Sequence, residues 1–161
     1  MSTTVGDDDL RHLTRSIELA AAAREHGNHP FGSLLVDGDG TVVLEAENTV
    51  VTGRDVTAHA EQNLVREASA GFEPEELAAH TLYTSTEPCA MCAGAIFWSG
   101  IGRVVFALSS ATLGEIVQDP TGEYTLALSC REVFERGGRT VEVQGPLIED
   151  DARIVHEGFW R

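Results

Sequence analysis

The amino-acid sequence predicts an α/β protein: a three-layer α/β/α sandwich built on a mixed five-stranded sheet. Helical and strand patterns alternate along most of the chain, two neighbouring strands are joined by a short glycine-rich turn, and the later strands are separated by helices. A tight turn favours an antiparallel pair, whereas alternation with helices favours a sheet that is covered on both faces.

The first elements follow from the spacing of apolar residues. Residues 1–8 form an acidic lead-in that we expect to be frayed, and from Leu10 apolar residues recur at helical spacing up to Gly27. The β-rich runs 32–36 and 41–46 flank a turn whose glycines supply the positive φ that a hairpin needs. A second helical pattern covers 58–70 and ends at Gly71.

The rest of the chain alternates in the same way. Pro88 opens a helix that extends to about Trp98, and 109–130 reads as a loop with a short helix, followed by another short helix at 130–136. The remaining predicted strands are 81–84, 103–108 and 140–143. A terminal helix is predicted from four apolar residues on one face: Ile148, Ala152, Val155 and Phe159.

Length and charge limit the possible functions. With 161 residues, the chain has the length of one compact domain, so we expect residues 1–161 to form a single domain. The 11 basic residues are all Arg, and 26 acidic residues bring the net charge to −15. An anionic surface repels phosphate groups, which argues against membrane and nucleic-acid partners. The N-terminus lacks the basic start and apolar core of a secretory signal, so the predicted location is cytoplasmic.

Several polar residues carry no motif and are expected at the surface. The run Asp7–Asp9 is predicted to be a solvated turn, and His12, His26 and His156 are predicted to be surface residues. Cys130 stands alone and is expected to be a small buried apolar residue.

One constellation carries chemistry. His59 and Glu61 stand two residues apart, and Cys89 and Cys92 follow at the i and i+3 spacing of one helix face. Two thiolates and one imidazole suit a Zn²⁺ ion and leave its fourth tetrahedral position open for water, which is typical of a catalytic site. We therefore expect one zinc ion per chain, with Glu61 beside the metal water as the proton carrier. A structural zinc site would need a fourth protein ligand, for which Cys130 and His80 are the spare candidates.

These residues also resemble a known family. The order H-x-E followed by P-C-x-x-C is the signature of zinc-dependent deaminases, and the segments 29–32, 57–61 and 83–98 are similar to the cytidine deaminase superfamily, in particular its guanine deaminase-like branch. The resemblance implies zinc ligation by His59, Cys89 and Cys92 and proton transfer by Glu61. It also implies four substrate contacts: the Asn48 side chain, the Ala60 backbone, and apolar walls from Phe31 and Trp98.

The implied reaction is hydrolytic deamination of an amino-substituted heterocycle, with guanine as the first candidate. Cytosine, s-triazines such as ammeline, and the nucleosides guanosine and cytidine are alternatives. A tRNA adenosine deaminase is disfavoured by the charge of −15, because such an enzyme needs a basic surface. A non-catalytic zinc module is the alternative outside enzymes. In guanine-specific relatives a second acidic group assists proton delivery, for which Glu115 is preferred here over Asp119.

The chain end is unusually aromatic, with Phe159 and Trp160 within the segment 157–161. Chain ends usually fray, so two aromatic residues there predict packing against something. The family resemblance implies a homodimer that can exchange C-terminal segments, so this tail is expected to cover the substrate pocket of a partner.

Overall fold

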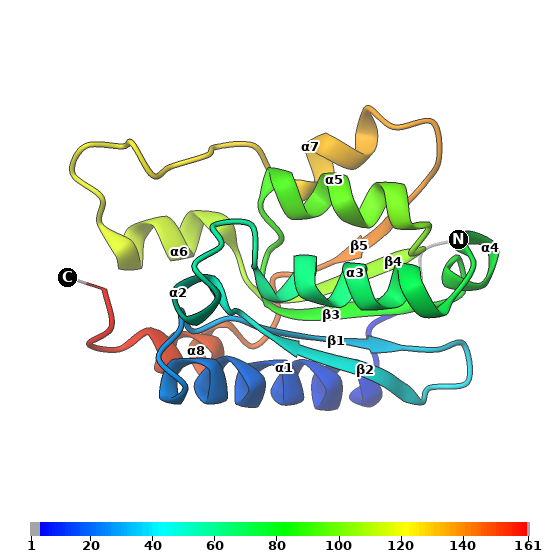
Figure 1. Cartoon of the computed structure of the whole chain (residues 1–161), viewed down its shortest axis with the longest axis horizontal. Coiled ribbons are helices and arrows are strands. Elements are labelled where there is room, and N and C mark those ends of the chain that lie inside the picture. The colour runs from blue at the N-terminus through cyan, green and yellow to red at the C-terminus, as the bar shows by residue number, and fades with distance from the viewer. Residues whose placement is uncertain (1–3, 161) are drawn as a thin grey trace.

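The structure is a computed structural model that describes residues 4–160, and Figure 1 shows its helices on both sides of one sheet. The strand order is β2-β1-β3-β4-β5. β1 pairs antiparallel with β2 and β3, whereas β3, β4 and β5 are parallel, so the predicted mixed five-stranded sheet is confirmed. The strands are β1 (Gly32–Val36), β2 (Val42–Glu47), β3 (Thr81–Thr86), β4 (Arg103–Leu108) and β5 (Glu142–Gln144).

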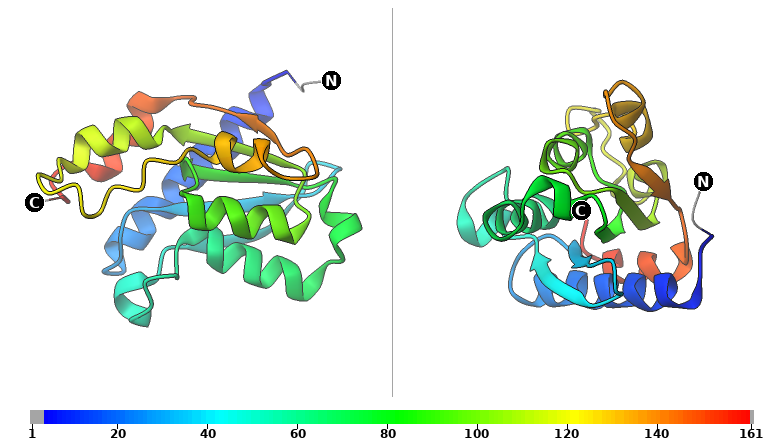
Figure 2. Two further views of the ribbon diagram at one scale, coloured as in Figure 1. Left: turned by 90° about the horizontal axis from the view of Figure 1, so that it is seen from above. Right: turned by 90° about the vertical axis from the view of Figure 1, so that its right-hand side faces the viewer.

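The helices form the two outer layers of the predicted sandwich. One face of the sheet carries α1 and α8, and the other carries α3, α5 and α7 (Figures 1 and 2). The helices are α1 (Asp7–Glu25), α2 (Val50–Gly53), α3 (Ala60–Gly71), α4 (Pro74–Leu77), α5 (Ala90–Ser99), α6 (Ser110–Val117), α7 (Cys130–Glu135) and α8 (Glu149–Arg153), followed by the 3₁₀ turn η1 (Ile154–His156). Within residues 4–160, none of these helices is long and apolar enough to cross a membrane.

Two apolar cores follow from this layering. One lies between the sheet and α3, α5 and α7 and includes Leu64, Ile96 and Phe134. The other lies between the sheet and α1 and α8 and includes Leu13 and Ala152. Central strands are covered on both faces of the sheet, and accordingly all five residues of β1 are buried, whereas the edge strand β2 is partly exposed.

The start of α1 differs from the prediction. Of the lead-in predicted to fray, residues 1–3 lie outside the described residues, and the helix already begins at Asp7. Asp9 is buried, and its carboxylate accepts hydrogen bonds from the Gly6 backbone N–H, the Tyr83 hydroxyl and the Arg103 guanidinium. The prediction of a solvated turn is therefore wrong for Asp9, which joins α1 to β3 and β4.

Two histidines predicted at the surface are also buried. His12 lies against the Tyr83 ring at 4.9 Å, and burial lowers its pKa. His156 is only 2% exposed, and its Nδ1 accepts a hydrogen bond from the Trp160 indole N–H at 3.0 Å. His26 remains at the surface as predicted, paired with the Glu47 carboxylate at 2.6 Å.

The predicted terminal helix is shorter than expected. It ends with η1 at His156, and Gly158 then adopts a left-handed backbone (φ 68°). Phe159 therefore lies beyond the helix and does not share a face with Ile148, Ala152 and Val155. The chain turns back instead toward the end of the molecule where α3 and α5 begin (Figure 1).

Candidate active site

The residues of the predicted metal site meet where two helices begin. His59 is the N-cap of α3 and Cys89 is the N-cap of α5, so both helices point their positive dipole ends at the same place. Pro88 precedes this cap and is not the first helical residue as the sequence predicts. Cys92 is the third residue of α5, and N-cap and third-residue side chains lie side by side in helices.

The three ligand atoms form one cluster. His59 Nδ1 lies 3.7 Å from Cys89 Sγ and 3.5 Å from Cys92 Sγ, and all three atoms lie within 4.8 Å of one another. Two sulfurs and one imidazole nitrogen at this spacing fit the tetrahedral preference of zinc. Within residues 4–160 no fourth His, Cys, Asp or Glu joins this cluster. The cluster is able to hold a zinc ion and leaves one coordination position free of protein.

Hydrogen bonds within the cluster shift the pKa of each ligand side chain. The Cys92 thiol donates to Cys89 and so lowers the pKa of Cys89 to about 4, against burial, which raises it, while His59 lowers it further. The same hydrogen bond together with burial raises the pKa of Cys92. Hydrogen bonding to Cys89 raises the pKa of His59. A lowered thiol pKa favours the thiolate, the form that a metal requires.

Neither spare candidate for a fourth ligand lies in the cluster. Cys130 is fully buried at the start of α7, and the Glu87 carboxylate accepts its backbone N–H and its thiol proton. His80 packs against the Phe72 ring at 4.9 Å and contacts the Glu76 carbonyl at 2.8 Å. Among the described residues, the geometry is therefore that of an open metal site and not of a closed structural one.

Glu61 lies beside this cluster, in the first turn of α3. The side chain is almost completely buried, and burial raises its pKa. The Thr84 hydroxyl donates a 2.8 Å hydrogen bond to Glu61 Oε1. Thr84 is not among the site residues predicted from the sequence, although a threonine in a buried strand next to a metal motif is a signal that could have identified it.

Asn48 and Ala60, two of the predicted substrate contacts, are both buried close to the ligands. The Asn48 backbone N–H donates to the Phe31 carbonyl at 3.1 Å, and the next residue, Thr49, donates its backbone N–H to the Ala58 carbonyl beside His59. Asn48 Oδ1 accepts the Val50 N–H at 3.0 Å. These bonds place Asn48 between Phe31 and the loop that carries the first metal ligand.

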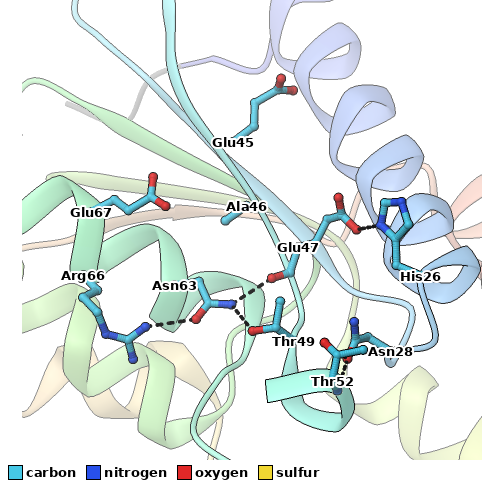
Figure 3. A pocket seen from close by; sticks show the side chains of 10 residues that line it. All are labelled: His26, Asn28, Glu45, Ala46, Glu47, Thr49, Thr52, Asn63, Arg66 and Glu67. Carbon is cyan, nitrogen blue, oxygen red and sulfur yellow. Dashed lines mark hydrogen bonds and ion pairs between the residues drawn. The ribbon is translucent and has the colours of Figure 1, made fainter. Parts of the chain in front are cut away.

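A groove of about 530 Å³ lies beside α3, and hydrogen bonds from residues that line it hold the loop that follows Asn48 (Figure 3). Asn63 donates to the Glu47 carbonyl and to Thr49 Oγ1, both at 2.9 Å. Asn28 Oδ1 accepts the Val51 and Thr52 N–H groups. None of the ten residues that line the groove is a predicted site residue, so its polar side chains support the loop next to the site.

Phe31 and Trp98, the two predicted apolar walls, are not close together. Phe31 lies next to the His156 ring at 5.6 Å and the Trp160 ring at 6.1 Å. Trp98 lies at the opposite end of α5 from the cysteines, is 82% exposed, and borders a groove with Pro74. Within one chain, the structure therefore does not bring Trp98 to the site, because Trp98 lies six positions, more than one and a half helical turns, after Cys92.

The aromatic residues of the C-terminal tail pack against other residues of the same chain. Phe159 and Trp160 contact the His29 ring at 5.9 and 5.6 Å, and the pKa of His29 is lowered by burial and by His59. Arg24 donates to the Val155 and Glu157 carbonyls at 2.8 and 2.7 Å and so anchors the turn before the tail. The prediction that the tail packs is confirmed for Phe159 and Trp160, on this chain's own His29 and Phe31, and Arg161 lies outside the described residues.

The two candidates for a second acid have different surroundings. Glu115 is exposed on α6. The Asp119 carboxylate accepts the Thr121 hydroxyl and the Thr121 and Tyr124 N–H groups, and these bonds lower its pKa. Asp119 is therefore engaged in holding the loop after α6. Neither carboxylate belongs to the cluster around the ligands.

Comparison with known proteins gives concordant results. The model of the cytidine and deoxycytidylate deaminase zinc-binding region matches residues 7–108. A probable cytosine deaminase of Schizosaccharomyces pombe is 43% identical over 159 residues, which cover 99% of this chain and 96% of the relative. A tRNA-specific adenosine deaminase of Bacillus subtilis is 31% identical over 153 residues, covering 95% and 89%. The solved structure of a guanine deaminase from Nitrosomonas europaea matches with a TM-score of 0.78 and 27% identity, over 96% of this chain and 84% of that one.

Proposed function

The chain belongs to the cytidine and deoxycytidylate deaminase family of zinc-dependent deaminases, and from that premise we propose that it removes the exocyclic amine of a free nucleobase. Cytosine is our first candidate. The observation that carries this choice is the 43% identity to the S. pombe probable cytosine deaminase over almost the full length of both chains.

Guanine, the first candidate from the sequence, is the second here. Its support is the TM-score of 0.78 with the N. europaea guanine deaminase, at 27% identity. Both bases are flat heterocycles with an amine next to a ring nitrogen, so the same chemistry serves either of them.

Zinc held by His59, Cys89 and Cys92 supplies a Lewis acid and an activated water when it is bound. The protein's own contribution to the chemistry centres on Glu61, which is buried beside the ligands and within the first turn of α3. In our proposal Glu61 accepts one proton from the attacking water and passes it to the ring nitrogen. It then accepts the second proton, from the hydroxyl group that has been added to the ring carbon, and gives it to the departing amine. Water and the base are consumed, and the oxo base and ammonia are released, so atoms and charges balance.

The residues around Glu61 suit a flat polar base. Asn48 is buried, the next residue, Thr49, is hydrogen-bonded to the Ala58 carbonyl beside His59, and the Ala60 backbone follows His59 directly. We propose that these two groups hydrogen-bond the edge of the ring. Phe31 and Trp160 offer neighbouring aromatic rings for its faces, and we therefore assign to Trp160 the apolar wall that was predicted for Trp98.

Two other functions have less support. A tRNA deaminase, suggested by the B. subtilis relative, has to bind a polyanion, which a chain with net charge −15 and no lysine opposes. A structural zinc module needs a fourth protein ligand, and the described residues bring only three together.

The test is an ammonia-release screen of cytosine, guanine, adenine, ammeline, cytidine, guanosine and an anticodon stem-loop RNA. We expect the highest kcat/KM with cytosine, followed by guanine. Glu61→Gln is the matched control and should lower kcat by about 10²- to 10⁴-fold. Release from the RNA alone, or from none of the compounds, would refute the proposal.

We also propose that the chain acts in the cytoplasm as a homodimer. The outward face of α5 supports self-association, because Trp98 and Met91, seven residues apart on that helix, are 82% and 36% exposed. Light scattering should give twice the chain mass for the wild type and a shift toward the monomer for Trp98→Glu. A monomeric wild type would refute this part of the proposal.

A further inference from the structure

A chain of three polar side chains runs through the core beneath the site. The Ser33 hydroxyl donates to Thr84 Oγ1 at 3.0 Å, and the Thr84 hydroxyl donates to Glu61 Oε1 at 2.8 Å. Ser33 and Thr84 are fully buried, and Glu61 is only 5% exposed. The three residues come from β1, β3 and α3, which are far apart in the sequence.

The direction of the hydrogen bonds follows from counting protons. Each hydroxyl has one proton to donate and can also accept. The Gly32 carbonyl lies 3.4 Å from Thr84 Oγ1, farther than Glu61 Oε1, so the Thr84 proton is directed to the carboxylate. Thr84 Oγ1 in turn accepts the Ser33 hydroxyl proton. The rotamer of Thr84 is therefore fixed by one hydrogen bond that it accepts and one that it donates.

The surrounding sheet shows that this pair is unusual for its position. Ser33 and Thr84 are direct cross-strand partners, and so are Leu35 and Leu82, two residues further along on the same face. Leu35 and Leu82 belong to the apolar core under α3 and α5. The face changes from leucine to hydroxyl side chains at the place where Glu61 lies above it. A buried hydroxyl is costly without a partner, and here the partner is the carboxylate.

We propose that Thr84, held in place by Ser33, is a positioning residue that orients the Glu61 carboxylate for proton transfer. By engaging Oε1, Thr84 fixes the plane of the carboxylate and leaves proton exchange to Oε2. The inference rests on the proposed function, because it requires Glu61 to carry the proton. Partners of this kind, one step removed from a metal site, typically change activity by about 10- to 100-fold when they are removed.

The test compares Thr84→Val, which keeps the shape and removes the hydroxyl, with Thr84→Ser, which keeps the hydroxyl. We expect Thr84→Val to lower kcat for ammonia release by about 10- to 100-fold while KM and bound zinc stay close to wild type. Thr84→Ser should restore most of kcat. Wild-type kcat in Thr84→Val, a change confined to KM, or equal losses in both variants would each overturn the inference.

Two further variants guard against effects of folding. Ser33→Ala leaves Thr84 in place and should lower kcat by a smaller factor, about two- to tenfold. This variant keeps the inference testable if Thr84→Val does not fold. Wild-type kcat in Ser33→Ala would then overturn the inference. Ser99→Ala is the matched control. Its hydroxyl is also buried and hydrogen-bonded, to Ile96 and Ile101 at the far end of α5, and its removal should leave kcat unchanged.

Failure of this inference differs from failure of the proposed function. An active Glu61→Gln enzyme would refute proton transfer by Glu61, and the proposed function with it. An inactive Glu61→Gln enzyme beside a fully active Thr84→Val enzyme would refute only the positioning role.

Discussion

The buried carboxylate of Asp9 should make a measurable and pH-dependent contribution to stability. The pKa of Asp9 is lowered from its ordinary 3.8 to about 2: burial raises it, but hydrogen bonds from Arg103, Tyr83 and the Gly6 N–H outweigh that effect. At about 1.36 kcal/mol per pKa unit, this corresponds to about 2 kcal/mol of unfolding free energy at neutral pH. Asp9→Asn should therefore lower the unfolding free energy by about 2 kcal/mol.

The pH dependence gives the sharper test. Because the folded-state pKa lies below the unfolded one, the contribution is fully present above about pH 4 and is lost as the pH falls toward about 2. The difference between wild type and Asp9→Asn, measured by urea unfolding, should be constant from about pH 7 to pH 5 and shrink below about pH 4.

Asp8→Asn provides the matched control. The Asp8 side chain is 78% exposed and pairs only at the surface with Arg11, so its loss should cost less than about 0.5 kcal/mol. Equal effects of the two substitutions, or a difference between wild type and Asp9→Asn that stays constant down to about pH 3, would refute the reasoning.

Three further predictions concern the site. Cys92→Ser should lose zinc during dialysis against a chelator, as measured by elemental analysis, whereas Cys130→Ser should retain it; equal retention would remove Cys92 from the ligand set. Deleting residues 157–161 should raise KM about tenfold, because Trp160 no longer lies beside Phe31, or weaken dimerisation where the tail is exchanged between chains; an unchanged KM and an unchanged monomer–dimer balance would contradict this. Glu115→Gln tests the second acid: a loss of kcat of at least about tenfold is expected if Glu115 delivers a proton, and full activity would exclude it.

The sequence predicted the parts of the fold that depend on local pattern. Apolar runs identified the strands within a few residues, although β5 begins at Glu142 and not at residue 140. The zinc cluster was predictable because its ligands have fixed spacings within two short motifs. All three predicted ligands meet within 4.8 Å.

Residues whose role depends on distant partners were not predictable in this way. The buried Asp9 carboxylate is paired with Arg103, which stands 94 positions later in the sequence. Thr84 meets Glu61 only when α3 packs over β3. Trp98 and Trp160 are both aromatic residues near helix ends, and only the path of the chain decides which of them meets Phe31.

Because the ligands lie at the starts of two helices, a bound metal ion would also restrict local unfolding at this end of the protein. His59 and Cys89 are 30 positions apart, so a bound zinc ion acts as a crosslink that closes a loop containing α3, α4 and β3. Any fluctuation that separates the starts of α3 and α5 must first break this crosslink. The dissociation rate of the metal would then report how often this end of the protein opens, and could be followed in solution without any substrate.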